Sequence, residues 1–177
     1  MTKLELMLAG FGGQGILFAG KLVAYAGLIE DKHVSWLPSY GPEMRGGTCN
    51  CSVCVSDEQI GSPQMLTPNA LIAMNQPSLE KFIGHVQPGG IVLVDSSIIP
   101  TKVDRTDLKV FYVPATEIAE KNGLKGMANI LLTGKLLKET GFASVENAKA
   151  AVSKVVPPKK ANLIDSNLKA LQLGLDY

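Results

Sequence analysis

A glycine-rich turn between an apolar run and a helical pattern constrains the fold of this chain more than any other feature. The apolar run covers residues 3–9, the turn reads G-F-G-G-Q-G over residues 10–15, and apolar residues then recur with a helical period over residues 16–29. An apolar run with little alternation is typical of a strand buried on both faces of a parallel sheet. A second strand, expected over residues 33–37, completes a βαβ unit.

The rest of the chain continues this pattern and predicts an α/β fold in a single domain over residues 1–177. A hairpin is expected between a strand at residues 49–55 and a short strand at residues 59–61. We expect a mostly parallel sheet with helices on both faces, the glycine turn between its first strand and first helix, and a helical C-terminal part. The other expected strands cover residues 70–74, 91–94 and 110–113, and the other expected helices cover residues 78–86, 116–122, 128–140, 145–154 (capped by Ser144) and 161–173.

Composition excludes several classes of partner. The chain has 177 residues, 46% of them hydrophobic and 19% charged, with a formal net charge of +1. This balance fits a globular domain and favours neither nucleic acid nor an anionic membrane as a partner. No apolar run reaches the roughly 18 residues that a membrane helix needs. The first five residues do not resemble a signal peptide, so a cytoplasmic location is expected.

Three cysteines, Cys49, Cys51 and Cys54, could suggest a metal site. A tetrahedral site needs four ligands, and the chain has no fourth cysteine. His33 and His85 could complete such a site only if folding happened to bring one of them to the cysteines. If the segment is a strand, Cys49 and Cys51 share one face and Cys54 points to the other. The sequence therefore predicts three buried structural thiols and no metal site.

The glycine turn is open to three interpretations. It matches a dinucleotide-binding fingerprint, but the second strand does not end in the acidic residue that would hold a ribose. It could instead bind an anion at the N-terminus of the following helix, where N–H groups are unpaired. It could also only pack the helix on the sheet. The amide of Gln14 could face a ligand or a partner chain. The candidate binding residues are Gly10, Gly12, Gly13, Gln14 and Gly15.

A second glycine-rich patch covers residues 39–48 and contains Tyr40, Glu43 and Arg45. Glu43 and Arg45 could form a surface ion pair of little energetic weight. Alternatively, the glycines let the backbone approach another surface closely, which points to an interface. No nucleotide fingerprint includes such a patch.

Five motifs together resemble the gamma subunit, or gamma domain, of the 2-oxoacid:ferredoxin oxidoreductases. They are the glycine turn, the patch at residues 39–48, and the segments at residues 50–53, 73–82 and 128–134, which occur in order over nearly the whole chain. Within that family the resemblance is greatest to the 2-oxoglutarate enzyme. The cysteines are not part of the resemblance.

The resemblance implies a subunit of a larger assembly. Such complexes decarboxylate a 2-oxoacid oxidatively to an acyl-CoA and pass the electrons to ferredoxin. They use thiamine diphosphate, Mg²⁺, iron–sulfur clusters and coenzyme A. This chain has no thiamine diphosphate motif, no ferredoxin cysteine run and no recognisable catalytic triad, so we expect it to be inactive alone and to bind no cofactor by itself. The implied partners are alpha, beta and ferredoxin-like delta subunits, ferredoxin or a similar acceptor, and a second copy when the chain is isolated.

The resemblance also implies roles for particular residues. The glycine turn would hold a phosphate of coenzyme A or face a subunit interface. Residues at an interface, or covering the active site of the complex, would be Tyr40, Glu43, Arg45, Asn50, Asn75 and Asn129. Alternative functions are the gamma subunit of a branched-chain 2-oxoacid or pyruvate enzyme, a stand-alone Rossmann-like nucleotide-binding oxidoreductase, and a scaffold without any ligand.

Overall fold

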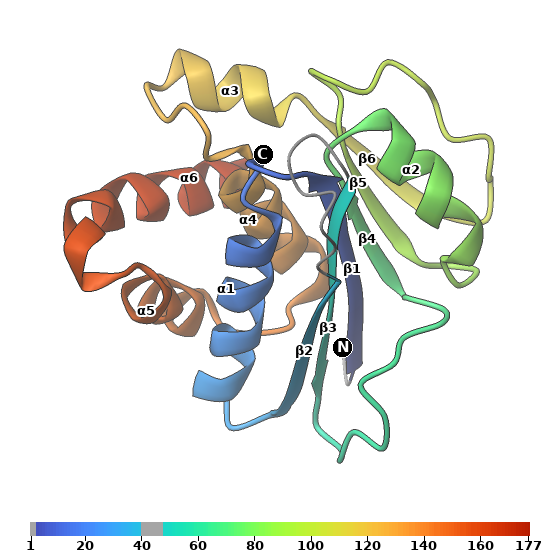
Figure 1. Cartoon of the computed structure of the whole chain (residues 1–177), viewed down its shortest axis with the longest axis horizontal. Helices are drawn as coiled ribbons and strands as arrows, with labels where there is room; N and C mark the ends of the chain where they lie inside the picture. The colour runs from blue at the N-terminus through green and yellow to red at the C-terminus, as the bar shows by residue number, and fades with distance from the viewer. Residues whose placement is uncertain (1–2, 40–47) are drawn as a thin grey trace.

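A six-stranded sheet in the order β2-β3-β1-β4-β5-β6 forms the middle of the molecule and has helices on both of its faces (Figure 1). The computed structural model describes residues 3–39 and 48–177. The strands are β1 (Lys3–Phe11), β2 (His33–Ser39), β3 (Thr48–Ser56), β4 (Ala70–Ala73), β5 (Ile91–Asp95) and β6 (Lys109–Val113).

Strand direction confirms the mostly parallel sheet. β1, β4, β5 and β6 pair in parallel, whereas β3 runs antiparallel to both of its neighbours, β1 and β2. β1 and β2 therefore point the same way, as a βαβ unit requires, but β3 lies between them. The hairpin expected with residues 59–61 is wrong. Those residues form no strand, because β1 and β2 already occupy both edges of β3.

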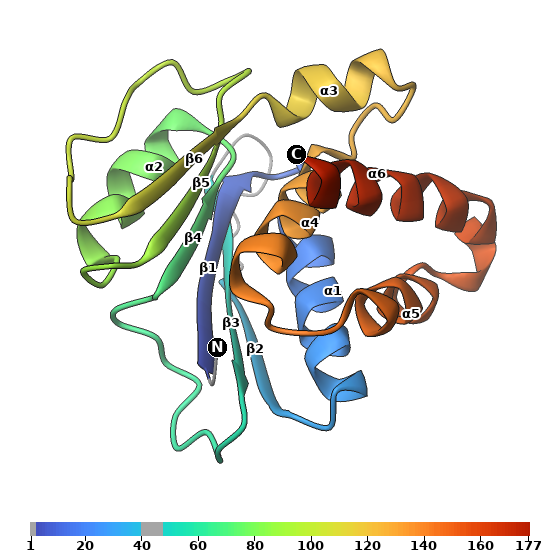
Figure 2. The same ribbon diagram turned by 180° about the vertical axis from the view of Figure 1, so that it is seen from behind.

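Helices cover both faces of the sheet unequally, as Figure 2 shows from behind. α1, α4, α5 and α6 lie on one face, α2 lies on the other, and α3 lies at the end of the sheet where β1 and β4 finish. The helices are α1 (Ile16–Ile29), α2 (Gln76–Phe82), α3 (Ala115–Lys121), α4 (Ala128–Thr140), α5 (Val145–Val155) and α6 (Ile164–Asp176), with 3₁₀ turns at Ile83–His85 and Pro158–Leu163. The side chain of Ser144 caps α5 as expected. No helix in the described ranges is long and apolar enough to cross a bilayer.

Two apolar cores follow from alternation along the central strands. On β4, Ala70 and Ile72 belong to the larger core beneath α1 and α4, while Leu71 and Ala73 belong to the smaller core beneath α2. Both faces of the central strands are thus buried, which explains their continuous apolar sequence. The carboxyl ends of β1 and β4 lie side by side in parallel register, so the loops that follow them leave from the same edge of the sheet.

A pair of glycines brings the two largest C-terminal helices together. Gly134 on α4 faces the backbone carbonyl of Leu171 on α6, and Gly174 on α6 faces the carbonyl of Leu131 on α4. A Cβ atom at either glycine would overlap the facing carbonyl. This close approach fixes α4, whose N-terminus contributes to the candidate site.

Candidate functional site

The candidate site lies where the chain leaves β1 and β4. From β1 the chain turns to α1 on one face of the sheet, and from β4 it turns to α2 on the other face (Figure 1). In open α/β sheets the crevice at such a switch point, beyond the carboxyl ends of the strands, is the usual ligand site. The structure places the glycine turn and Asn75 on either side of this switch point.

The glycines of the turn serve different purposes. Gly10 is still part of β1, and a Cβ there would come within 2.8 Å of Cδ1 of Ile16. Gly13 and Gly15 have φ angles of 97° and 74°, in the left-handed region that favours glycine. Gly12 lies half-buried within the turn. Glycine is therefore required for backbone shape at two positions and for close approach at a third.

Gln14 braces the end of β1 against the end of β4. Its Oε1 accepts a hydrogen bond from the backbone N–H of Phe11 at 2.6 Å, and its Nε2 donates to the carbonyl of Met74 at 2.9 Å. The backbone N–H of Met74 in turn donates to the carbonyl of Ala9 at 2.9 Å. Both ends of the Gln14 amide thus have partners within the chain, and a ligand at this turn would meet backbone N–H groups.

The N-terminus of α1 is uncapped. Gly15 occupies the cap position without a side chain, and the first turn contains no acidic residue. The free N–H groups of the first turn and the helix dipole give such an end a partial positive charge of roughly half an elementary charge. Nothing in the first turn neutralises it, so the geometry suits an anion.

Asn129 connects α4 to the glycine turn. It is almost fully buried, and its Nδ2 donates to the carbonyl of Gly15 at 2.9 Å across 114 residues of sequence. The carbonyl of Gly15 also accepts from the N–H of Ala19. The structure therefore brings together two of the residues expected at the site, and this contact fixes the start of α1.

Asn75 and Asn50 lie on other elements near the same edge. Asn75 caps α2, its Oδ1 accepting from the N–H of Ser78 at 2.8 Å. Its Nδ2 and the hydroxyl of Ser78 are buried without a hydrogen-bond partner among the described residues. Asn50 is half-buried on β3, paired in register with Ala9 and Ser39.

The second glycine-rich patch is anchored at this edge. Ser39 ends β2 opposite Asn50, and Thr48 begins β3 opposite Phe11, the last residue of β1. The expected interface residues Tyr40, Glu43 and Arg45 lie outside the described residues. Both ends of the patch therefore start from the edge that carries the glycine turn.

A cavity of about 260 Å³ opens beside the turn. Among the described residues, its ionisable lining residues are Glu120 and Lys125. The remaining lining residues are Gly13, Gln14, Met74, Ile98, Thr116, Ala119, Gly126 and Ala128. These groups can bind and orient a molecule through hydrogen bonds and through one charge of each sign.

Sequence reasoning missed the polar contact that supports this cavity. Asp95 is fully buried at the end of β5, and its carboxylate accepts from the hydroxyl of Thr116 at 2.6 Å. The N–H groups of Thr116 and Ser97 also donate to it, at 3.3 Å and 3.2 Å. An acidic residue directly after a buried apolar strand was the available signal. The contact fixes the start of α3, which forms one wall of the cavity.

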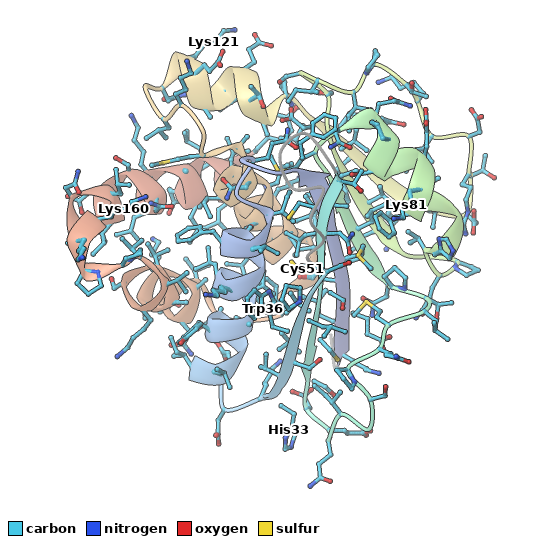
Figure 3. The ribbon with its side chains drawn as sticks, viewed as in Figure 1. His33, Trp36, Cys51, Lys81, Lys121 and Lys160 are labelled. Carbon is cyan, nitrogen blue, oxygen red and sulfur yellow. The ribbon has the colours of Figure 1, made fainter. Side chains whose placement is uncertain are left out.

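The three cysteines are free and buried, as expected. Cys49 and Cys51 belong to the core beneath α1, whereas Cys54 points to the other face of β3. Burial raises the pKa of all three thiols, that of Cys51 to about 12. Figure 3 shows Cys51 in the interior near Trp36. In residues 3–39 and 48–177, no group of three or more His, Cys, Asp or Glu side chains is arranged to hold a metal ion.

Comparison with known proteins identifies the class. Residues 5–177 match the family described as pyruvate ferredoxin/flavodoxin oxidoreductase. The chain belongs to this family, and within it to the gamma-type chains of the 2-oxoacid:ferredoxin oxidoreductases. The resemblance noted from the sequence is thereby confirmed.

Individual relatives are similar over almost the whole chain. A ketoisovalerate oxidoreductase subunit, VorA of Methanothermobacter marburgensis, is 40% identical over 99% of this chain, which spans only 36% of that protein. A 2-oxoglutarate synthase subunit, KorC of Methanocaldococcus jannaschii, is 37% identical over 97% of this chain and 92% of its own length. The keto/oxoacid ferredoxin oxidoreductase gamma subunit of Geobacter sulfurreducens superposes with a TM-score of 0.83 at 32% identity, covering 98% of this chain and 96% of its own.

Proposed function

We propose that this chain, as one gamma-type domain over residues 1–177, is a subunit of a 2-oxoacid:ferredoxin oxidoreductase. The complex would decarboxylate a 2-oxoacid oxidatively to an acyl-CoA and pass electrons to ferredoxin. This subunit contributes binding surface and no catalytic group. Similarity to gamma-type chains over nearly the full length carries the proposal. Its partners are alpha, beta and delta subunits, and the cytoplasmic location stays a prediction.

We propose 2-oxoglutarate as the substrate of the complex. The sequence motifs resemble those of the 2-oxoglutarate enzyme, and the 2-oxoglutarate synthase subunit KorC is 37% identical over 97% of this chain. Ketoisovalerate is the second candidate, because VorA has the higher identity, 40%. Assaying the native complex with both acids distinguishes the two, and pyruvate serves as a third substrate in the same assay.

The cofactors of the reaction are assigned to the partner subunits. Thiamine diphosphate with Mg²⁺ would supply the carbanion chemistry, and iron–sulfur clusters would carry the electrons. The cysteines of this chain do not fit a cluster, because Cys49 and Cys51 lie in the core beneath α1 whereas Cys54 points to the other face of β3. A cluster requires four ligands that converge on one centre.

The glycine turn would bind a phosphate group of coenzyme A. The uncapped N-terminus of α1 supplies backbone N–H groups, and Lys125 supplies a positive charge in the adjacent cavity, whose other ionisable lining residue is Glu120. The N–H groups and the lysine favour an anion, and the cavity beside them has room for part of a small molecule. The orienting contacts of Gln14 and Asn129 keep this arrangement fixed before the ligand arrives.

Substitution of Lys125 in the assembled complex tests this assignment. Lys125→Ala should raise the KM for coenzyme A about tenfold, the loss expected for one charge-assisted contact, and leave kcat unchanged. Lys121→Ala is the matched control, because Lys121 is also a lysine in this region but pairs with Glu117 on α3. Equal KM values for coenzyme A in the two variants would show that coenzyme A does not bind in this cavity.

Purification tests the assignment to a complex. The tagged chain, expressed with its neighbouring genes, should co-purify with a thiamine diphosphate-containing subunit, and the chain alone should not reduce a viologen dye with any 2-oxoacid. Tight binding of NAD, NADP or FAD by the chain alone would favour the stand-alone oxidoreductase instead.

A further inference from the structure

A second cavity, of about 300 Å³, lies between the starts of α1 and α4 and the segment that joins α5 to α6. It lies next to the cavity beside the glycine turn, since Gly126 lines both. Its apolar lining includes Phe18, Ile130, Val156 and Leu163. A space of this size accepts one or two apolar side chains but only a small part of a larger ligand.

Two buried amides line this cavity with unused acceptors. Asn129 and Asn167 are 3% and 5% exposed. Their Nδ2 atoms donate to the carbonyls of Gly15 and Leu163, at 2.9 Å and 2.8 Å, which fixes the plane of each amide. No described residue donates a hydrogen bond to either Oδ1 atom. An occupant that satisfies them must carry hydrogen-bond donors as well as apolar groups.

One lysine lines the cavity, and two more lie close to it along the chain. Lys160 lines the cavity and, like Lys159, lies on the segment between α5 and α6. Lys154 lies in the last turn of α5, and all three lysines are exposed. Figure 3 shows Lys160 at the periphery of the molecule. In the described part of the chain none of the three forms a salt bridge, and Asp165 is the only acidic residue in the stretch 154–165. The mouth therefore favours a carboxylate.

We infer that this cavity receives an extended peptide segment of another subunit, in which an apolar side chain is followed within two residues by Asp or Glu. The apolar side chain fills the cavity, backbone N–H groups donate to the two Oδ1 acceptors, and the carboxylate pairs with Lys159 or Lys160. A peptide supplies all three features in one short stretch.

This inference rests on the proposed function, since it requires an assembled complex. The relatives support a protein occupant. In VorA the region similar to this chain accounts for 36% of a longer protein, so this domain occurs there covalently joined to further polypeptide. A domain in that setting needs a surface on which its neighbour packs.

Photo-crosslinking in the assembled complex tests the inference. A benzoyl-phenylalanine replaces Leu163, which lines the cavity and is half-buried, and a control places the same group at exposed Lys121 on α3. After irradiation, mass spectrometry should identify one peptide of another subunit, crosslinked from position 163 only, with an acidic residue within two positions of an apolar one.

A charge reversal gives an independent measurement. The double variant Lys159→Glu and Lys160→Glu should raise the Kd for the remaining subunits about tenfold at low ionic strength, and less at high salt, because exposed charges are screened. Lys149→Glu on α5 is the control, being exposed and outside the cavity. It should leave the Kd unchanged.

The outcomes separate the inference from the proposed function. If the chain does not assemble with thiamine-dependent subunits, the proposed function fails. If it assembles but position 163 yields no crosslink to another subunit, or the crosslinked peptide has no acidic residue, the inference alone is overturned. A small molecule released from the complex on denaturation that abolishes the crosslink when added back also overturns it.

Discussion

At the scale of single residues, Gly15 meets two constraints at once. Its φ of 74° lies in the left-handed region, and a Cβ would overlap the amide of Asn129. We predict that Gly15→Ala destabilises the protein by about 3 kcal/mol, the sum of backbone strain and the overlap. Gly141→Ala is the matched control, because Gly141 has a φ of 59° but open space around it. Gly141→Ala should lower the free energy of unfolding, measured in urea, by about 1 kcal/mol. Equal losses of stability in the two variants would show that the overlap with Asn129 does not contribute.

The residues of the site could be predicted only in part from the sequence. The turn and its helix follow from local spacing, and Asn129 came from the resemblance. The partner of Asp95 could not be foreseen, since Thr116 lies 21 residues away and is brought beside it only by the pairing of β5 with β6. Gln14 was expected to face a ligand or partner, but its amide is held within the chain because Met74 directly follows β4 beside it.

At the scale of elements, the contact between α4 and α6 depends on two glycines. We predict that Gly134→Ala or Gly174→Ala destabilises the protein by about 3 kcal/mol or more, because the added methyl group overlaps a backbone carbonyl that cannot move without its helix. Gly84→Ala is the control, since nothing lies near the Cβ position there. The Tm of each variant and of the control is measured by thermal unfolding. A Tm for Gly134→Ala near that of the control would refute the close approach of these helices.

The junction of α1 with α5 gives stability a pH dependence. Glu30 accepts hydrogen bonds from the backbone N–H of Ser144 and from Nδ2 of Asn147. The bond from Ser144, above all, lowers the pKa of Glu30 from its usual 4.5. A carboxyl group with a lowered pKa stabilises the fold fully above its unfolded pKa, and this contribution is lost as the pH falls through the folded pKa.

We therefore predict that Glu30→Gln has a lower Tm than the unaltered chain at pH 6–8, and that the difference shrinks below about pH 4.5. Tm measured across this range checks the prediction. Asp104→Asn, at an exposed position without a hydrogen bond from the described residues, should show no such difference. A difference that persists unchanged to pH 3 would contradict the role of the Glu30 charge.

The elements were predicted unevenly, for physical reasons. α1 and α4 have the bounds expected, because their apolar period is long and uninterrupted. The last helix begins at Ile164, since the residues before it form a 3₁₀ turn after two prolines. The short strand at residues 59–61 does not form. The turn residues Asp57 and Glu58 suggested a hairpin partner for β3, but β1, distant in sequence, pairs with that edge through nine residues.

At the scale of the whole molecule, one large core spans most of the sheet. It includes residues of β1, β3, β4 and β5 together with those of α1, α4, α5 and α6. We predict a single cooperative unfolding transition in urea. Fluorescence of Trp36, the only tryptophan, reports on β2 at one end of the sheet, while far-UV circular dichroism reports mainly on the helices. The two midpoints should coincide. Loss of helical signal before any change at Trp36 would mean that the C-terminal helices unfold on their own.

The reversed strand β3 also determines when the protein can begin to fold during synthesis. β1 and β2 do not touch within the sheet, and each pairs with β3. A nascent chain that has emerged only through residue 39 therefore contains two strands and a helix but no strand pair. Once residue 56 has left the ribosome, β3 joins both strands in one step, and a three-stranded sheet covered by α1 becomes possible. Until then the apolar faces of these segments are unprotected, and chaperones are most needed during this interval.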